Sequence, residues 1–455
     1  MFRTDCEGFS RRNFLQIGSA GMLGLTLPTI LASEAHAAAK AKETGTDGKA
    51  PKAKSVILVW LAGGPATIDM WDNKPEAPEG IRGEFKSIDT KAKGVQFAET
   101  LTKMAGVADK VSVVRSLYHT IPSHGPATVF MTTGNKPTAA IQYPSMGSVA
   151  AKMLKTDVGI PPFVSFMDLR NGAAGGAGYL GAGYNAFTVE SNGGGGKGAP
   201  AAEKGDKGAA FRLRGITLPN GVSLEDLSKK DQLLKSFDDG FRKLDGQSDL
   251  VDGLDTFHKQ AIEILRSDKT KKAFSLGEES AAIRESYGTG PIGPAALAAR
   301  RLVQAGVRFV TLGFGGFDTH SKTFEAHKTK LMPSLDGALA ALIADLDQQG
   351  MLDSTIVMCA GEFGRTPKIN KNAGRDHWAR SMAAVLAGGG IKRGYAHGTT
   401  DASGMAPNLD ACTPDDLGAT IFGQLGIAQN TEIQSPTGRP IQLFREGKAI
   451  EKLIG

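Results

Sequence analysis

The C-terminal half of the sequence contains five residues of the types that bind metals: Asp318, His320, Glu362, Asp376 and His377. The first two follow a β-branched run at 307–312, the third follows a similar run at 355–358, and the last two lie in a loop. Carboxylates and imidazoles together suit zinc, manganese or iron better than an ion that prefers oxygen alone. The residues therefore predict a site for a divalent transition metal.

The two β-branched runs are predicted to be neighbouring strands of a parallel sheet. The segment between them, 331–346, has apolar residues at helical spacing, and a helix is the crossover that a parallel pair requires. Side chains that follow the carboxyl ends of parallel strands converge in one crevice. Three clusters at successive element ends therefore favour a metal site over unrelated turn residues.

Two N-terminal segments offer further candidates. An apolar run at 55–61 (SVILVWL) precedes a loop with Asp69, which either binds the metal or caps the turn. A second predicted strand, 111–116, leads to His124 at the start of a predicted helix. The amides of such a helix start attract anions, although the same residues fit an ordinary helix capped by Ser123.

Composition narrows the class of protein. The 455 residues are enough to bury a substantial core, and alternating strands and helices over 55–455 predict one α/β domain with helices on both faces of the sheet. The net charge of +6 is spread along the chain, so we expect solubility and no nucleic-acid partner. No apolar stretch of this domain approaches the roughly 20 residues of a membrane span. Cys359 and Cys412 are expected to be free thiols rather than a disulfide.

The N-terminus has the order of an export signal. A twin-arginine motif at 10–15 (SRRNFL) precedes a weakly apolar segment and then Ala35-His36-Ala37, a small-x-small cleavage site. Residues 1–37 are thus predicted to be a twin-arginine signal peptide, which implies a periplasmic or extracellular protein. Residues 38–54 are polar and are predicted to be a disordered linker.

Two internal segments are expected to lie outside the site. The glycine-rich stretch 189–210 is predicted to be a flexible surface insertion, because it lacks the GxxxxGK[ST] pattern of a phosphate loop. The segment 223–286 has apolar residues at helical spacing and is predicted to be largely helical.

Several motifs resemble one family: VILVWLAGGPATIDMWDNKP, HTIPSHGPATVFMTTG, GFDTH, AGEFGRTPKIN and GRDHW, together with the twin-arginine leader. The chain resembles the exported bacterial family called domain of unknown function 1501 over essentially its whole mature length. That family is similar to the alkaline phosphatase and sulfatase superfamily. The resemblance implies an alkaline-phosphatase-like, mostly parallel sheet between helices, with one or two metal ions at the strand ends.

By position, Asp318 and His320 resemble a metal-binding pair of the superfamily, and His377 resembles the late histidine of the same site. Glu362 stands where the superfamily has an Asp followed directly by His, but Phe363 follows it here. His124 would lie near the position of the superfamily's nucleophile.

Two roles stay open at this point. The hydroxyl nucleophile of a phosphatase would be Thr128, Ser123 or Thr67, and the sequence does not choose among them. Arg365 would either contact an anionic oxygen of the substrate or pair with a carboxylate. The CxPSR motif of sulfatases is absent, which disfavours a polysaccharide sulfatase with formylglycine chemistry.

These observations favour an exported metal-dependent hydrolase that acts on phosphate or sulfate esters, with a small molecule or a polysaccharide ester as substrate. In that hypothesis Asp318, His320, Glu362 and His377 hold the metal, and Asp69 and Asp376 either bind it or support its ligands. His124, Thr128 and Arg365 serve catalysis. The alternative is a non-catalytic exported binding protein that keeps the fold and part of the metal site.

Overall fold

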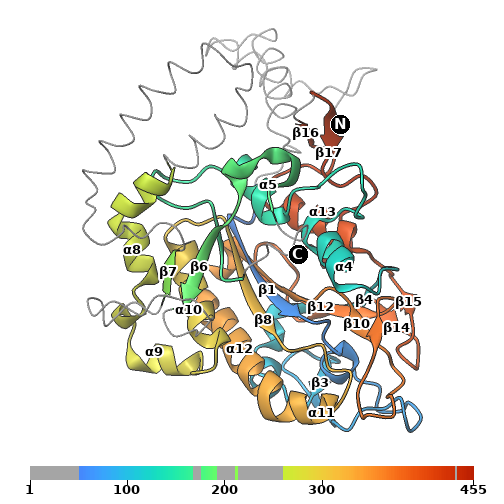
Figure 1. Ribbon diagram of the computed structural model, residues 1–455. Helices are drawn as coiled ribbons and strands as arrows, with labels where there is room; N and C mark the ends of the chain where they lie inside the picture. Colours follow the sequence, from blue (N-terminus) through green and yellow to red (C-terminus); the bar gives the residue numbers. More distant parts are fainter. Residues whose placement is uncertain (1–50, 168–175, 192–210, 214–259, 436–437) are drawn as a thin grey trace, which may run out of the picture.

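The computed structural model describes residues 51–167, 176–191, 211–213, 260–435 and 438–455 (Figure 1). The predicted signal peptide, residues 192–210 of the glycine-rich stretch and 214–259 lie outside these residues. So do residues 38–50 of the predicted linker. Among the described residues, no helix is both long enough and apolar enough to cross a membrane.

A nine-stranded sheet forms the centre of the molecule, in the order β13-β4-β12-β9-β1-β8-β5-β6-β7. Its middle strand β1 (Ser55–Ala62) runs parallel to both neighbours, β8 (Phe309–Gly315) and β9 (Thr355–Ala360). Seven of its eight residues are buried. An uninterrupted apolar run is what a parallel strand covered on both faces requires.

The outer strands extend this core to both edges. On one side β5 (Phe163–Ser165) and β6 (Phe187–Ser191) continue the parallel sheet, and β7 (Phe211–Leu213) ends it. On the other side β12 (Met382–Ala387) is antiparallel to both β9 and β4 (Val111–Leu117), and β13 (Tyr395–His397) pairs with β4. Because β12 is antiparallel to both of these strands, β4 points the same way as β9. The predicted fold class, a mostly parallel α/β sheet, is confirmed.

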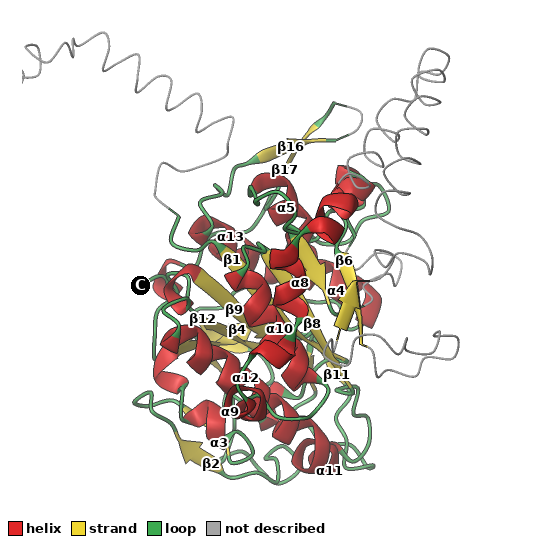
Figure 2. Cartoon of the chain, turned by 90° about the vertical axis from the view of Figure 1, so that its left-hand side faces the viewer, coloured by secondary structure: helices red, strands yellow, loops and turns green. Residues whose placement is uncertain are grey.

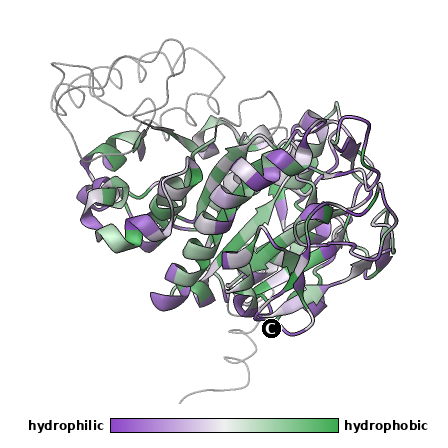
Figure 3. Cartoon of the chain, turned by 90° about the horizontal axis from the view of Figure 1, so that it is seen from below, coloured by the Kyte–Doolittle hydropathy of each residue, from purple (hydrophilic) through white to green (hydrophobic). Residues whose placement is uncertain are grey.

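Helices cover both faces of the sheet (Figure 2). Alternate residues of β1 enter two separate apolar clusters, Ile57 and Val59 in one, Leu58 and Trp60 in the other. The first cluster includes residues of α3 (Thr102–Ala105), α8 (Asp268–Phe274), α10 (Ile292–Gln304) and α12 (Met332–Gln348). The second includes residues of α4 (His124–Thr133), α5 (Met146–Met153) and α13 (Pro414–Gln424). Figure 3 shows the hydrophobic residues concentrated along the strands between these layers.

The remaining elements are short. They are the helices α9 (Ala281–Ser286) and α11 (Thr323–Ala326), and the strand pairs β2 (Ser87–Asp89) with β3 (Gln96–Ala98), β10 (Gly364–Arg365) with β11 (His377–Trp378), β14 (Thr399–Thr400) with β15 (Pro407–Leu409), and β16 (Glu432–Gln434) with β17 (Pro440–Gln442).

Two predicted boundaries were wrong by a few residues. The linker predicted at 38–54 extends too far, because Ala53 is buried and the backbone N–H groups of Lys52 and Ala53 donate to the carbonyl of Gln424. The insertion predicted at 189–210 begins too early, since β6 extends to Ser191. Cys359 and Cys412 are free thiols, as predicted, and both are buried.

A buried ion pair connects the loop after β1 to the loop before β11. Arg375 donates to both carboxylate oxygens of Asp69 at 2.7 and 2.8 Å, and the side chains are 0% and 1% exposed. The same guanidinium donates to the carbonyls of Ile81, Thr366 and Pro367. Five acceptors thus satisfy the buried charge and hold the loop that ends at His377.

We expect Arg375→Met to lower the free energy of unfolding by about 3–5 kcal/mol, because the Asp69 carboxylate is left buried without its partner. Denaturant unfolding followed by circular dichroism measures this change. Lys269→Met is the control, since Lys269 pairs with Asp157 at the surface and such pairs contribute at most about 1 kcal/mol. Equal unfolding midpoints for the two variants would contradict the prediction.

His327 is a fully buried histidine at the start of a π-helical turn, His327–Leu331. Neither ring nitrogen has a hydrogen-bond partner within the described part of the chain. The ring stacks on Phe85, with ring centroids 6.4 Å apart, and meets the edge of Phe317. Burial lowers the pKa of His327 to about 3, and the charges of Arg375 and Arg365 act in the same direction.

We expect this histidine to make the fold sensitive to acid. Below a pKa of about 6.5 the unfolded chain binds a proton that the folded protein excludes until about pH 3, so stability falls as the pH falls. Between pH 7 and pH 4 the loss from this group is about 3 kcal/mol, at about 1.4 kcal/mol per pKa unit. His327→Phe keeps the ring stack and should remove this part of the loss. Parallel pH dependences of unfolding in the two proteins would exclude the effect.

Candidate metal centre

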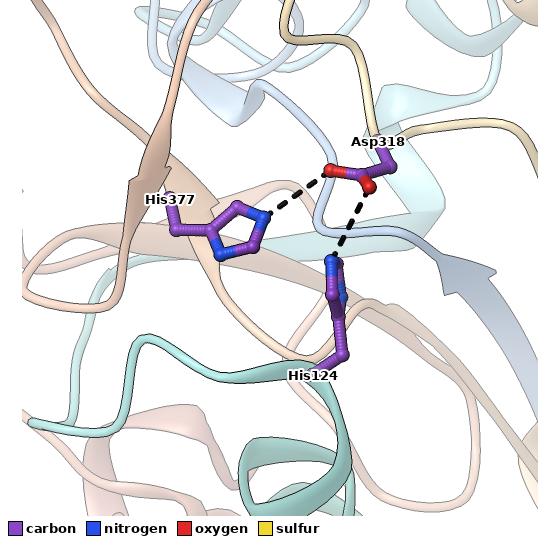
Figure 4. A group of neighbouring side chains, drawn as sticks. All are labelled: His124, Asp318 and His377. Carbon is purple, nitrogen blue, oxygen red and sulfur yellow. Dashed lines mark hydrogen bonds and ion pairs between the residues drawn. The ribbon is translucent and has the colours of Figure 1, made fainter.

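Four segments bring polar side chains together at the end of the sheet where strands β4, β8 and β9 terminate. The loops after β8 and β9 carry Asp318 and Glu362, and the loop after β4 leads to His124, the first residue of α4. Because β4, β8 and β9 point the same way, these loops leave the sheet at a common edge. His377 lies at the start of β11. Figure 4 shows the side chains of His124, Asp318 and His377 pointing toward one another.

Asp318 lies at the centre of three histidines. One ligand atom each of His124, Asp318 and His377 lies within 4.8 Å of the others. The Nε2 atom of His377 is 3.2 Å from Asp318 Oδ1, and that of His124 is 3.5 Å from Oδ2. His320 is adjacent, with its Nε2 atom 3.0 Å from Asp318 Oδ1 and 3.1 Å from His377 Nε2. The side chains are between 24% and 49% exposed, so solvent reaches the cluster.

Each of the three histidines uses its outer nitrogen for a hydrogen bond. The Nδ1 atom of His124 lies 2.6 Å from Glu362 Oε1, and that of His320 lies 2.7 Å from Asp376 Oδ1. The Nδ1 atom of His377 lies 3.0 Å from the carbonyl oxygen of Pro122. Carboxylates and carbonyls accept, so these Nδ1 atoms carry the protons. In a neutral imidazole the lone pair then lies on Nε2, directed at the centre.

Glu362 is buried beside this cluster. Its Oε1 atom accepts from His124 and from the backbone N–H of Gly63 at 2.9 Å, while Oε2 has no partner among the described residues. Gly63 has φ +112°, and a Cβ atom there would lie 2.4 Å from the backbone nitrogen of Asp318. A side chain at this position would push apart the loop after β1 and the loop after β8.

Arg365 fixes the carboxylate of Asp318. Its guanidinium is fully buried and donates to Asp318 Oδ1, to the carbonyls of Gly63 and Gly64, and to the carbonyl of Arg375. Partial burial opposes ionisation of Asp318, but the hydrogen bond and charge of Arg365, with His377 beside the carboxylate, bring its pKa down to about 2. The carboxylate is therefore an anion at neutral pH. The hydrogen bond from His320 also holds the pKa of Asp376 below its usual range.

Two predicted site residues are placed differently from the expectation, and a third makes one of the two contacts expected of it. Asp69 does not reach the cluster, because Arg375 occupies both of its carboxylate oxygens. The hydroxyl of Thr128 is buried inside α4 and donates to the carbonyl of His124 at 2.7 Å. Arg365 pairs with Asp318, which is the second of the two alternatives left open by the sequence.

Other residues of the site were not predicted. His119 is buried, accepts from the N–H of Ile121 at Nδ1 and donates from Nε2 to the carbonyl of Glu362 at 2.7 Å. Asn370 donates to Asp376 and to the carbonyl of His320. His119, the first histidine of HTIPSH, is visible in the sequence as a candidate. The carbonyl of Pro122 belongs to the backbone, so no side-chain pattern could indicate it.

The donors fit a divalent transition metal. Two nitrogens at about 2.0–2.1 Å from a tetrahedral zinc ion lie roughly 3.3 Å apart, close to the 3.1 Å between the Nε2 atoms of His320 and His377. Metal-binding histidines ordinarily donate their other ring nitrogen to a carboxylate or a carbonyl. That pattern holds for all three histidines.

Solved structures to which the chain is similar include hydrolases. A phosphonate monoester hydrolase from Silicibacter pomeroyi is 11% identical, with a TM-score of 0.36, over 88% of this chain and 76% of that one. A Pseudoalteromonas sulfatase, PsFucS1, is 12% identical, with a TM-score of 0.32, over 78% and 66%. Alkaline phosphatase from the Antarctic bacterium TAB5 is 11% identical, with a TM-score of 0.30, over 78% and 96%. No curated protein matches the sequence.

The sequence itself matches one protein family, and the matched residues, 53–454, include every residue of the cluster described above. The matched length far exceeds half of the chain. The protein therefore belongs to the family described as protein of unknown function DUF1501.

Proposed function

We propose that this protein is an exported metal-dependent hydrolase of phosphate or sulfate esters. The observation that supports the proposal is the double hydrogen-bonding pattern of its histidines. Three Nε2 atoms face the Asp318 carboxylate, while three Nδ1 atoms are held by Glu362, Asp376 and the Pro122 carbonyl. A cluster of surface histidines without a ligand role has no need of an outer acceptor for every ring.

The residues of this centre divide into ligands and supports. His124, Asp318 and His377 would hold a zinc, manganese or iron ion, with His320 as the adjacent donor. Glu362 and Asp376 orient His124 and His320. The Oε2 atom of Glu362, which has no partner among the described residues, is a donor available to a second ion.

An ion at this centre would polarise an ester oxygen and make an attacking water more acidic. Asp318 would contribute negative charge, and Arg365 holds that carboxylate in place instead of contacting substrate. We assign no bond-breaking role to Thr128, since its hydroxyl is committed within α4. Water from the open face of the cluster is the proposed nucleophile.

The alternative is a non-catalytic exported protein that binds a metal or an oxyanion. It is favoured by one observation. Two of the three candidate nucleophiles, Thr67 and Thr128, are buried and hydrogen-bonded, and the Thr67 hydroxyl accepts from the N–H of Ala383; Ser123 is the exposed one.

We expect the mature protein to retain one or two equivalents of zinc, manganese or iron after dialysis, and Asp318→Ala/His377→Ala to lose at least one. Elemental analysis measures the content, and Asp157→Ala, an exposed carboxylate away from the cluster, is the control. Glu362→Gln should lower the metal affinity about 10- to 100-fold, since it weakens the support of His124. Equal metal content in the wild type and the double variant would remove the basis of the proposal.

We also expect the metal-loaded protein to hydrolyse at least one of 4-nitrophenyl phosphate, bis(4-nitrophenyl) phosphate and 4-nitrophenyl sulfate. His320→Ala should reduce kcat/KM about 100-fold or more, and Thr128→Ala should keep it within a few-fold of wild type. Release of 4-nitrophenol measures turnover. A folded, metal-loaded protein that turns over none of these esters would favour the binding-protein alternative.

A further inference from the structure

A surface pocket adjoins the candidate metal centre through His377. Its volume is about 410 Å³, which is within the range of small-molecule sites. The lining residues are Thr120, Pro122, His377, Trp378, Ala379 and Arg380. His377 therefore belongs to the candidate metal centre and also lines the pocket. A molecule that reaches the metal ligands can extend into this pocket.

Trp378 forms a firmly held apolar wall. Its indole N–H donates to the carbonyl of Met405 at 2.8 Å. The loop around Met405 is itself ordered by Asp401, whose carboxylate accepts from the backbone N–H groups of Ser403, Met405 and Ala406. The partly exposed ring thus has a defined orientation beside Pro122 and Ala379.

Arg380 supplies an uncommitted positive charge. It is exposed, and it makes no ion pair or hydrogen bond with the residues that the structure describes. Most other arginines near the site are engaged, Arg365 and Arg375 by buried acceptors. A guanidinium recognises a carboxylate, sulfate or phosphate through two parallel hydrogen bonds.

We propose that this pocket binds the alcohol portion of the ester substrate, and that this portion is a ring with a second anionic group. The inference rests on the proposed hydrolase function and specifies its substrate class. The ring lies against Trp378, and its anionic substituent contacts Arg380. Sugar acids and aryl acids share this chemistry, and the probes below separate them.

The tryptophan content allows a direct test. The chain has three tryptophans, of which Trp60 and Trp71 are 1% and 0% exposed, while Trp378 is partly exposed. Protein labelled with 5-fluorotryptophan should give three fluorine resonances, and Trp378→Phe identifies the one from the pocket. Unchanged positions of the other two show that the variant folds.

We expect galacturonate or benzoate to shift the Trp378 resonance saturably, and more strongly than galactose or benzyl alcohol. Arg380→Gln should weaken binding of the anionic probe about 10-fold and leave the neutral probe unchanged. Arg284→Gln, on α9 and also exposed, is the matched control. The stronger of the two acids identifies the ring as sugar or aryl.

Three outcomes would overturn the inference: no shift with any probe, equal effects of the two arginine variants, or an equal shift with acetate, which lacks a ring. The titration is repeated with Asp318→Ala, because a carboxylate bound only at the metal would lose its effect there. Failure of the hydrolase proposal is recognised separately, by absent metal or absent turnover with the Trp378 shifts intact.

Discussion

The site depends on one buried guanidinium. Arg365 lies beneath the cluster, fully removed from solvent, and its donors contact the loops after β1 and β8 and the loop before β11. A buried charge is tolerated only when it is paired and its hydrogen bonds are satisfied. The three loops must therefore close around this side chain. Their closure puts Asp318 at the centre, where the histidines meet it.

The chemistry of the centre follows from how each ring is supported. An imidazole on a surface loop rotates freely and presents either nitrogen. Here the outer acceptor selects the tautomer and the direction of the lone pair. The position of two histidine rings is also fixed by an apolar contact. The ring centroid of Phe363 lies 4.9 Å from that of His124 and 4.6 Å from that of His377. Phe363, which directly follows Glu362, thus forms a packed wall of the cluster.

Local patterns predicted the strands and the convergence at their ends. The apolar runs of β1, β8 and β9 and the helical spacing of α12 are visible in the sequence, because burial imposes them directly. The partner of Asp69 could not be predicted, since Arg375 lies 306 positions away and any arginine would have served. The carbonyl of Pro122 was equally inaccessible, because every residue carries one. Sequence patterns indicated which side chains gather, and only the folded chain shows which of them are already paired.

The position of β1 has a consequence for synthesis of the protein. Among the described strands this one is made first, yet both of its neighbours, β8 and β9, lie some 250 to 300 residues later in the chain. At about 5–20 residues per second, the ribosome needs roughly 15 to 60 s to deliver them. During that interval the segment SVILVWL has no partner strand, and such apolar, uncharged segments are prone to aggregate. A holding chaperone that covers the nascent N-terminal half is therefore expected to raise the yield of folded protein.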